Sequence, residues 1–178
     1  MLWQGDVTAA SSTRLDFFDG YATRAAASST NIDVTNIGVI TAANVLTVLE
    51  NVVAAVPDSL FENPDFVLHM STATFRMYQR ADRALTTKGQ EQWGAADQVF
   101  ANIPIRHYSQ FPANKVIGCV ATNGQDSCLY AAVDKSKDVE NMIIEKLRPE
   151  GEHYFLKALF KMDANFSIDS ESVYYAGS

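Results

Sequence analysis

Hydrophobic and polar residues alternate along the chain with two periods, one typical of helices and one typical of strands. The clearest helical period runs from about Thr41 to Val56, where apolar positions recur three and four residues apart. These positions are Val45, Val48, Leu49, Val52, Val53 and Val56. Thr41 can cap the start, and Pro57 ends the helix because proline disfavours helical geometry at the preceding residue. We therefore expect a long helix here, with one face buried.

A buried strand and a second helix follow. Phe66-Val67-Leu68-His69-Met70 is a compact apolar run that is typical of a buried strand. Ser71 comes next as an N-cap, and the helix that it starts carries Phe75 and Tyr78 and reaches about Arg83.

Weaker patterns predict shorter elements on either side. Towards the N-terminus they are a short strand at Leu2–Val7, a helix carrying Leu15, Phe18, Ala22 and Ala25 with Gly20 as its weak point, and a brief strand at Asn31–Thr35. Towards the C-terminus they are a surface loop at Ala84–Asn102, an edge-type strand starting at Ile103-Pro104-Ile105, a mixed charged stretch at Asp134–Arg148, a strand at Glu152–Met162 for which a helix is the alternative, and one or two closing strands at Asn165–Tyr175. The whole pattern predicts an α+β fold with a mixed sheet.

Asn123-Gly124 is a strong hairpin signal. Two apolar runs, Lys115–Ala121 and Ser127–Val133, flank it and predict paired strands. With a two-residue turn, Cys119 faces Cys128 at a non-hydrogen-bonded position, where side chains approach closely. We expect two adjacent, buried, reduced thiols, with a disulfide after oxidation as the alternative.

Composition narrows the class of protein. Of the 178 residues, 47% are hydrophobic and 20% are charged, which is typical of a folded domain. Apolar runs are too short to cross a membrane, and the N-terminus has no secretory-signal pattern. The formal net charge is −7 and the basic residues are scattered singly, so we expect no specific nucleic-acid binding. Two cysteines are too few for a disulfide scaffold, which favours a reducing compartment.

The sequence contains no motif of catalytic or cofactor chemistry. His69, His107 and His153 lie far apart, without a second ligand at metal-binding spacing. We interpret them as structural or solvent-facing, with His69 as a hydrogen-bonded core residue. No phosphate-binding loop, dinucleotide fingerprint or serine nucleophile elbow occurs. We therefore assign no catalytic, cofactor-binding or metal-binding residue, no cofactor and no enzymatic activity.

Clustered carboxylates are the remaining candidates for chemistry. The groups are Asp16 and Asp19, and Asp58, Glu62 and Asp65. They could in principle share a proton, but they flank turns and helix ends, where acidic residues serve as caps and oppose the helix dipole. A later run consists of Glu140, Glu145, Glu150 and Glu152, with Lys146 and Arg148 between them. We interpret it as a solvated face.

Several local motifs follow one another in a characteristic order. From the N-terminus they are Trp3-Gln4-Gly5, Phe18-Asp19-Gly20, the helix at Thr41–Val56, the strand and helix start at Phe66–Thr74, Ile103-Pro104-Ile105, the proline-bearing stretch Phe111–Gly118, and the alternating stretch Phe155–Phe166. In this order they resemble the tailed-bacteriophage major capsid proteins with the Hong Kong 97-like fold. The glycine that this family usually has before the isoleucine-proline pair is Asn102 here.

The resemblance implies a capsid-type α+β fold, in which a long spine helix packs on a mixed or antiparallel sheet and an axial lobe is added. The spine-helix lobe would comprise residues 1–65 and be completed by about 161–178, and the axial-type lobe would comprise 66–160. The chain would correspond to the C-terminal part of such a protein. It would lack the N-terminal arm and the extended loop that tie subunits together, so we expect that it does not close a shell alone.

The resemblance also implies a function. The chain would be a structural virion protein, a major capsid subunit that tiles an icosahedral phage or prophage shell. Its partners would be further copies in capsomer rings, with packaged DNA only as enclosed content and no membrane. It would be made in the cytoplasm of a bacterial host and end in the virion. Two alternatives stay open: an encapsulin-like nanocompartment shell protein, and a small α+β enzyme with an unrecognised site.

Overall fold

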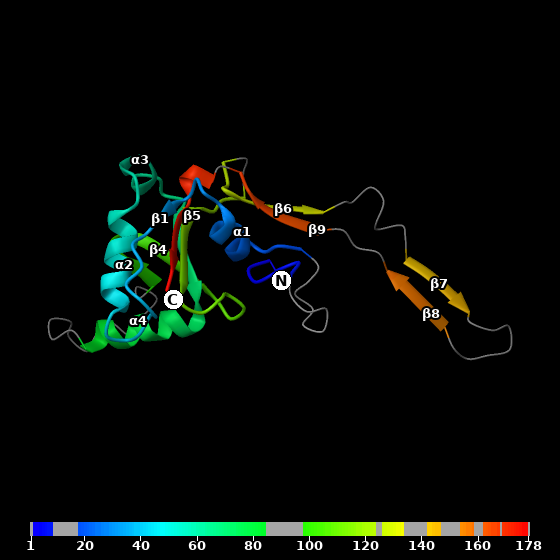
Figure 1. Cartoon of the computed structure of the whole chain (residues 1–178), viewed down its shortest axis with the longest axis horizontal. Helices are drawn as coiled ribbons and strands as arrows, with labels where there is room; N and C mark the ends of the chain where they lie inside the picture. The colour runs from blue at the N-terminus through cyan, green and yellow to red at the C-terminus, as the bar shows by residue number, and fades with distance from the viewer. Residues whose placement is uncertain are drawn as a thin grey trace.

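The computed structural model shows an α+β fold built around one mixed sheet (Figure 1). It describes residues 2–8, 18–84, 98–123, 126–133, 142–146, 154–158, 162–167 and 169–177. The helices in these stretches are α1 at Tyr21–Ala27, α2 at Val45–Ala54, α3 at Asp58–Phe61, α4 at Thr72–Ala84 and the 3-10 helix η3 at Asp169–Glu171. In the described part of the chain, none of the helices is long and apolar enough to cross a membrane.

The main sheet has the strand order β1-β10-β5-β2-β4-β3. The strands are β1 at Ile32–Asp33, β10 at Val173–Ala176, β5 at Lys115–Val120, β2 at Phe66–Ser71, β4 at Ile103–Tyr108 and β3 at Val99–Phe100. β1 runs parallel to β10 and β2 parallel to β4, whereas the other neighbours are antiparallel. Parallel strands need a crossover connection, and α4, which begins directly after β2, forms part of it. The sheet is therefore mixed, as predicted.

The sheet separates two apolar clusters, because successive residues of a strand point to opposite faces. Along β5, Val116 and Val120 belong to the cluster with α2 and α4, whereas Ile117 and Cys119 belong to the cluster with α1. Burial from both sides explains why β2 and β5 are almost continuously apolar in sequence.

Helix α2 confirms the strongest sequence prediction but is shorter than expected. The face carrying Val45, Val48, Leu49 and Val52 is fully buried. Thr41 does not cap the helix. Its N–H instead donates to the side-chain oxygen of Asn44 at 2.7 Å, and this turn precedes the first helical residue, Val45.

Helix α4 begins as predicted, at the end of β2. The Ser71 hydroxyl accepts a hydrogen bond from the Thr74 N–H at 3.0 Å and so caps the helix. Phe75 and Tyr78 are buried on the inner face. The Tyr78 hydroxyl donates to the Val99 carbonyl at 3.0 Å, which ties α4 to β3 at the edge of the sheet.

The predicted hairpin at Asn123-Gly124 is wrong. β5 already has β2 on one side and β10 on the other, so both of its edges are occupied. The strand after the turn, β6 at Leu129–Val133, pairs with β9 at Met162–Phe166 instead. The two predicted partners are linked by a hydrogen bond from the Cys128 N–H to the Val120 carbonyl at 2.9 Å. Residues 124 and 125 lie outside the described part of the chain.

A further strand pair was only partly predicted. β7 at Met142–Lys146 is antiparallel to β8 at Tyr154–Ala158, and Figure 1 shows this pair beyond the far end of β6 and β9. The sequence predicted one strand over Glu152–Met162, of which β8 and the first residue of β9 are described, with 159–161 outside the described residues. β7 was missed because its stretch mixes charged and apolar residues without a clear period.

Strands from both parts of the predicted two-lobe division share the main sheet. β1 and β10 fall within residues 1–65 and 161–178, and the other four strands fall within 66–160. The boundary between a spine-helix lobe and an axial lobe stays a prediction.

Candidate functional site

The two described histidines lie on adjacent strands and face opposite sides of the sheet. His69 of β2 contacts the Trp3 ring, with ring centroids 5.1 Å apart. His107 of β4 stacks on Phe75 of α4 at 4.4 Å. His153 lies outside the described residues. Within the described stretches, no three His, Cys, Asp or Glu side chains are arranged to hold a metal ion.

His69 is buried, but it is not the hydrogen-bonded core residue that we expected. Its side chain is 1% exposed, and neither ring nitrogen has a hydrogen-bond partner among the described residues. Burial lowers its pKa from 6.5 to about 3, and the nearby charge of Arg106 adds to this effect. The ring is therefore neutral at physiological pH and is held by aromatic contacts with Trp3 and Tyr108.

The candidate carboxylates lie at turns, as the sequence indicated. Asp58 is in the first turn of α3, and Glu62 and Asp65 follow it as exposed residues. Asp19 accepts a hydrogen bond from the Val7 N–H at 3.0 Å, and Asp16 is outside the described residues. The side chains of Glu140, Glu145, Glu150 and Glu152 also lie outside the described part of the structure. The hydrogen bond to Asp19 and the position of Asp58 at a helix start support structural roles for both residues.

The two cysteines are buried in one apolar cluster, and no disulfide joins them. Burial raises the pKa of the Cys119 thiol well above 9.0, and the neighbouring Cys128 contributes to the rise. A protonated, enclosed thiol is a poor nucleophile. The predicted pairing of β5 with β6 was wrong. Cys119 of β5 and Cys128, just before β6, nevertheless lie in the same cluster.

A hollow of about 360 Å³ opens beside α3. It is lined by Ser59, Leu60, Asn63, Val120, Asp126, Ser127, Cys128, Ser167 and Glu171. This lining carries two carboxylates and a thiol but no histidine, lysine or arginine among the described residues.

The two glycine motifs of the N-terminal region meet in space. The predicted strand at Leu2–Val7 is instead a turn, and the carbonyl groups of Leu2, Trp3 and Gly5 accept hydrogen bonds from the start of α1. Leu2 accepts from the Tyr21 N–H at 2.8 Å, and Gly5 accepts from the Gly20 N–H at 2.8 Å. We call residues 2–5 the N-terminal clasp. It satisfies backbone N–H groups that a helix start otherwise leaves without partners.

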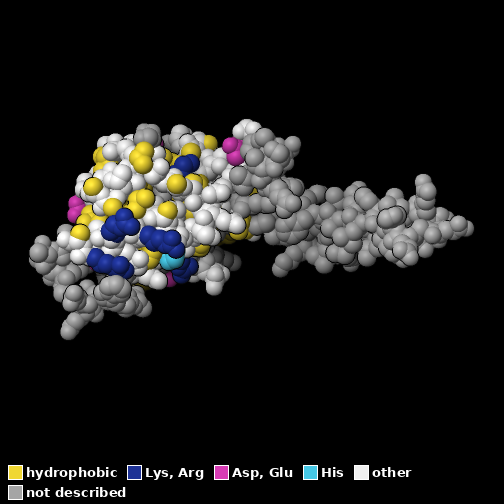
Figure 2. Space-filling view, turned by 90° about the horizontal axis from the view of Figure 1, so that it is seen from below, with side chains coloured by type: hydrophobic (Ala, Val, Ile, Leu, Met, Phe, Trp, Pro, Cys, Tyr) yellow, Lys and Arg dark blue, Asp and Glu magenta, His cyan; other side chains and the backbone are white. Residues whose placement is uncertain are grey.

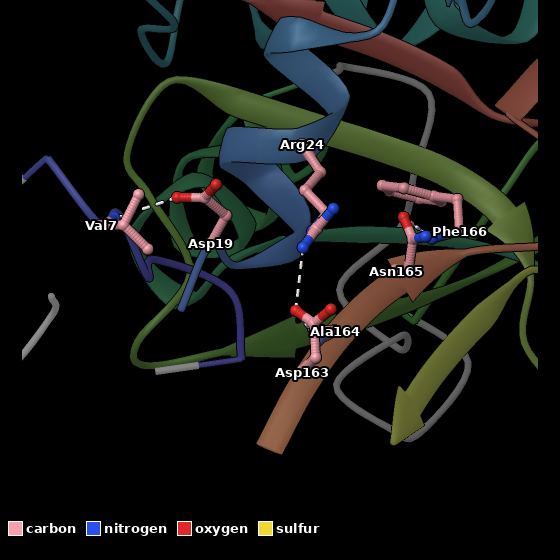
Figure 3. Close-up of polar contacts among 7 residues, drawn as sticks. All are labelled: Val7, Asp19, Arg24, Asp163, Ala164, Asn165 and Phe166. Atoms are coloured by element: carbon pink, nitrogen blue, oxygen red, sulfur yellow. Dashed lines mark hydrogen bonds and ion pairs between the residues drawn. The ribbon is translucent and has the colours of Figure 1, made fainter. Parts of the chain in front are cut away.

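The clasp also supplies the centre of an aromatic cluster. The Trp3 ring lies 4.9–5.2 Å from four other rings, measured between centroids. They belong to Tyr21, His69, Tyr108 and Phe111. Figure 3 shows two polar contacts around α1: the Val7 N–H meets Asp19, and Arg24 meets Asp163 of β9 at 2.9 Å. Contacts of Asp19 and Arg24 therefore hold α1 between the N-terminal segment and β9.

We expect Gly20→Ala to destabilise the protein by about 2–3 kcal/mol. A Cβ at Gly20 would lie 2.6 Å from the Gly5 nitrogen and 2.7 Å from the Trp3 carbonyl carbon, so the clasp would have to move. Urea denaturation measures the loss. Ser29→Ala, an exposed position just beyond α1, is the control and should stay within about 0.5 kcal/mol of the wild type. Equal midpoints for the two variants would contradict this account of the clasp.

Three arginines form a basic stripe on α4, although the sequence appeared to scatter its basic residues singly. Arg76, Arg80 and Arg83 are exposed and recur at helical spacing, opposite the buried Phe75 and Tyr78. Figure 2 shows Lys and Arg side chains gathered on this face of the molecule, beside a histidine. These arginines are four and three positions apart within a predicted helix, and this spacing was the sequence signal for the stripe.

Comparisons with known proteins bear on the fold. No protein-family model matches the chain, and no curated protein matches it. Among solved structures, it is similar to a chain of the "Satellite phage P4 procapsid including size determination (Sid) protein", with a TM-score of 0.63 and 14% sequence identity. The alignment covers 97% of this chain and 58% of that chain. The fold is of the capsid type.

This likeness confirms the capsid-type fold. Because the sequence identity is only 14%, it supports the fold alone. The chain is also similar to a "virus-like particle from Pyrococcus furiosus", with a TM-score of 0.48 and 14% identity over 85% of this chain and 57% of that chain. That likeness is too distant to add support. The chain spans less than three fifths of the length of either protein.

Proposed function

We propose that this chain is a non-enzymatic structural subunit of a viral shell, a major capsid protein of the tailed-phage type with the Hong Kong 97-like fold. The observation that carries the proposal is the likeness to a phage procapsid chain over 97% of the present chain. The order of the sequence motifs supports the finer assignment, because it resembles the same class of protein independently of the three-dimensional comparison.

The internal construction of the chain suits a shell subunit. A sheet buried from both faces makes a stiff unit, since close-packed interiors resist deformation. The conspicuous glycine motifs serve packing of the clasp on α1 and not chemistry. In this proposal the partners are further copies of the chain, DNA is enclosed without being read, no cofactor takes part, and the protein is made in the host cytoplasm and ends in the virion.

The composition of particles tests the proposal. Cells that carry the gene are induced to produce particles, which are separated on a density gradient and analysed by quantitative peptide mass spectrometry. We expect peptides of this chain among the most abundant species, co-sedimenting with packaged DNA. A chain that stays in the soluble fraction while particles form without it would refute the proposal.

A further inference from the structure

The basic stripe on α4 has a surface of opposite charge in the same molecule, at the other end of α2. Asp58, Glu62 and Asp65 are exposed around α3, and Phe61 among them is 45% exposed. Leu60 is buried and anchors this short helix to the core. We call these residues the α3 knob. It pairs an exposed aromatic ring with carboxylates, a combination that favours arginine as a partner.

The two surfaces lie at opposite ends of α2. Figure 1 shows α3 beyond one end of α2 and α4 crossing below the other end. They therefore cannot meet within one molecule, but they can meet between two. A contact between two different surfaces of identical chains is heterologous, and repetition closes it into a ring when the rotation between neighbours allows.

We propose that the α3 knob of one copy docks on the arginine stripe of α4 in the next copy. This inference rests on the proposed function and names the contact between neighbouring subunits. Arginine and aromatic residues are enriched at protein interfaces and supply most of their binding energy. Opposite charges on the two surfaces also fix the direction of docking, because stripe against stripe or knob against knob would bring like charges together.

Net charge and patch size favour a second copy over nucleic acid as the partner. The chain carries a formal charge of −7, so a polyanion is repelled by most of the molecule. Arg76 and Arg83 are seven positions apart, a distance of about 10 Å along a helix. A stripe of this length can contact only a few phosphates. The α3 knob is a compact acidic surface that is equally short in sequence, from Asp58 to Asp65.

Charge reversal on the full chain tests the docking by sedimentation velocity across a concentration series. Two double variants are prepared, Arg76→Glu/Arg80→Glu and Glu62→Lys/Asp65→Lys. Asp33→Lys/Glu50→Lys reverses two exposed carboxylates elsewhere and is the net-charge control for the second of these variants. Circular dichroism and urea midpoints verify that each variant folds.

We expect the wild type and the control to self-associate, and each reversal variant to do so at least about tenfold more weakly. An equimolar mixture of the two reversal variants should regain association, because the reversed surfaces again complement each other. Added salt should weaken the wild-type contact, since the Debye length falls to about 3 Å at about 1 M.

The docking is overturned if all samples sediment alike, whether associated or monomeric. It is also overturned if the mixture associates no better than either reversal variant alone.

A parallel titration with a DNA duplex tests nucleic acid as the alternative partner of the stripe. If Arg76→Glu/Arg80→Glu loses duplex binding but keeps self-association, the stripe is a nucleic-acid surface and the docking is wrong. Particles that contain the chain while both reversal variants associate normally would overturn the docking and leave the proposed function standing.

Discussion

Leu49→Asp should destabilise the protein by at least about 4 kcal/mol. Leu49 is fully buried in the cluster between α2, α4 and the sheet. Aspartate at this position leaves a cavity and places a carboxylate among buried apolar side chains. Because single domains are typically stable by only about 5–15 kcal/mol, much of the variant should be unfolded without denaturant. Urea denaturation followed by circular dichroism measures the difference.

Two further variants separate burial from charge. Leu49→Ala removes apolar contacts alone and should cost about 2–5 kcal/mol, which keeps the measurement within range if the aspartate variant does not fold. Thr47→Asp introduces the same charge on the exposed side of α2 and should stay within about 0.5 kcal/mol of the wild type. Similar losses for Thr47→Asp and Leu49→Asp would show that the face of α2 is misassigned.

Acid should destabilise the protein through His69. Its folded-state pKa is about 3, against 6.5 as the reference, so between these values the unfolded chain binds a proton that the folded chain does not. The stabilisation is therefore complete above the unfolded pKa and is lost as the pH falls towards the folded pKa. Between about pH 7 and about pH 4 this one group should remove about 3 kcal/mol of the free energy of unfolding.

Replacing the imidazole isolates this effect. His69→Phe keeps an aromatic ring beside Trp3 and Tyr108 and removes two buried nitrogens that have no hydrogen-bond partner among the described residues. We expect its urea midpoint to change much less with acid than that of the wild type. Met70→Leu, at the neighbouring buried position of β2, alters packing without a titratable group and should keep the wild-type acid dependence. If the phenylalanine variant keeps the wild-type slope, His69 is not the acid-sensitive group.

The sequence predicted those parts of the fold that depend on neighbouring residues. The buried faces of α2 and α4 and the Ser71 cap follow from spacing within a few turns of helix, and the structure confirms them. The partner of β5 could not be found in this way. Asn123-Gly124 indicates a reversal of the chain, but β2 and β10, which come from distant parts of the chain, occupy the edges of β5.

The functional features show the same limit. Gly20 looked like a weak point of a helix, and only the approach of Gly5 and Trp3 shows why a side chain does not fit there. His69 looked like a hydrogen-bonded core residue, because an apolar run around a histidine does not reveal that both ring nitrogens lack partners among the described residues. The spacing of the arginines of α4 was visible in the sequence, but their exposure on one face follows from the packing of the opposite face of the helix against the sheet.

Cryo-electron microscopy of particles from cells that carry the gene tests the central claim most directly. If the chain is a shell subunit, the reconstruction shows a closed symmetric shell in which the six-stranded sheet, with α2 and α4 on one face and α1 on the other, fits repeatedly around the symmetry axes. A shell whose density is fully accounted for by a different polypeptide, with no repeated place for this fold, would contradict the account.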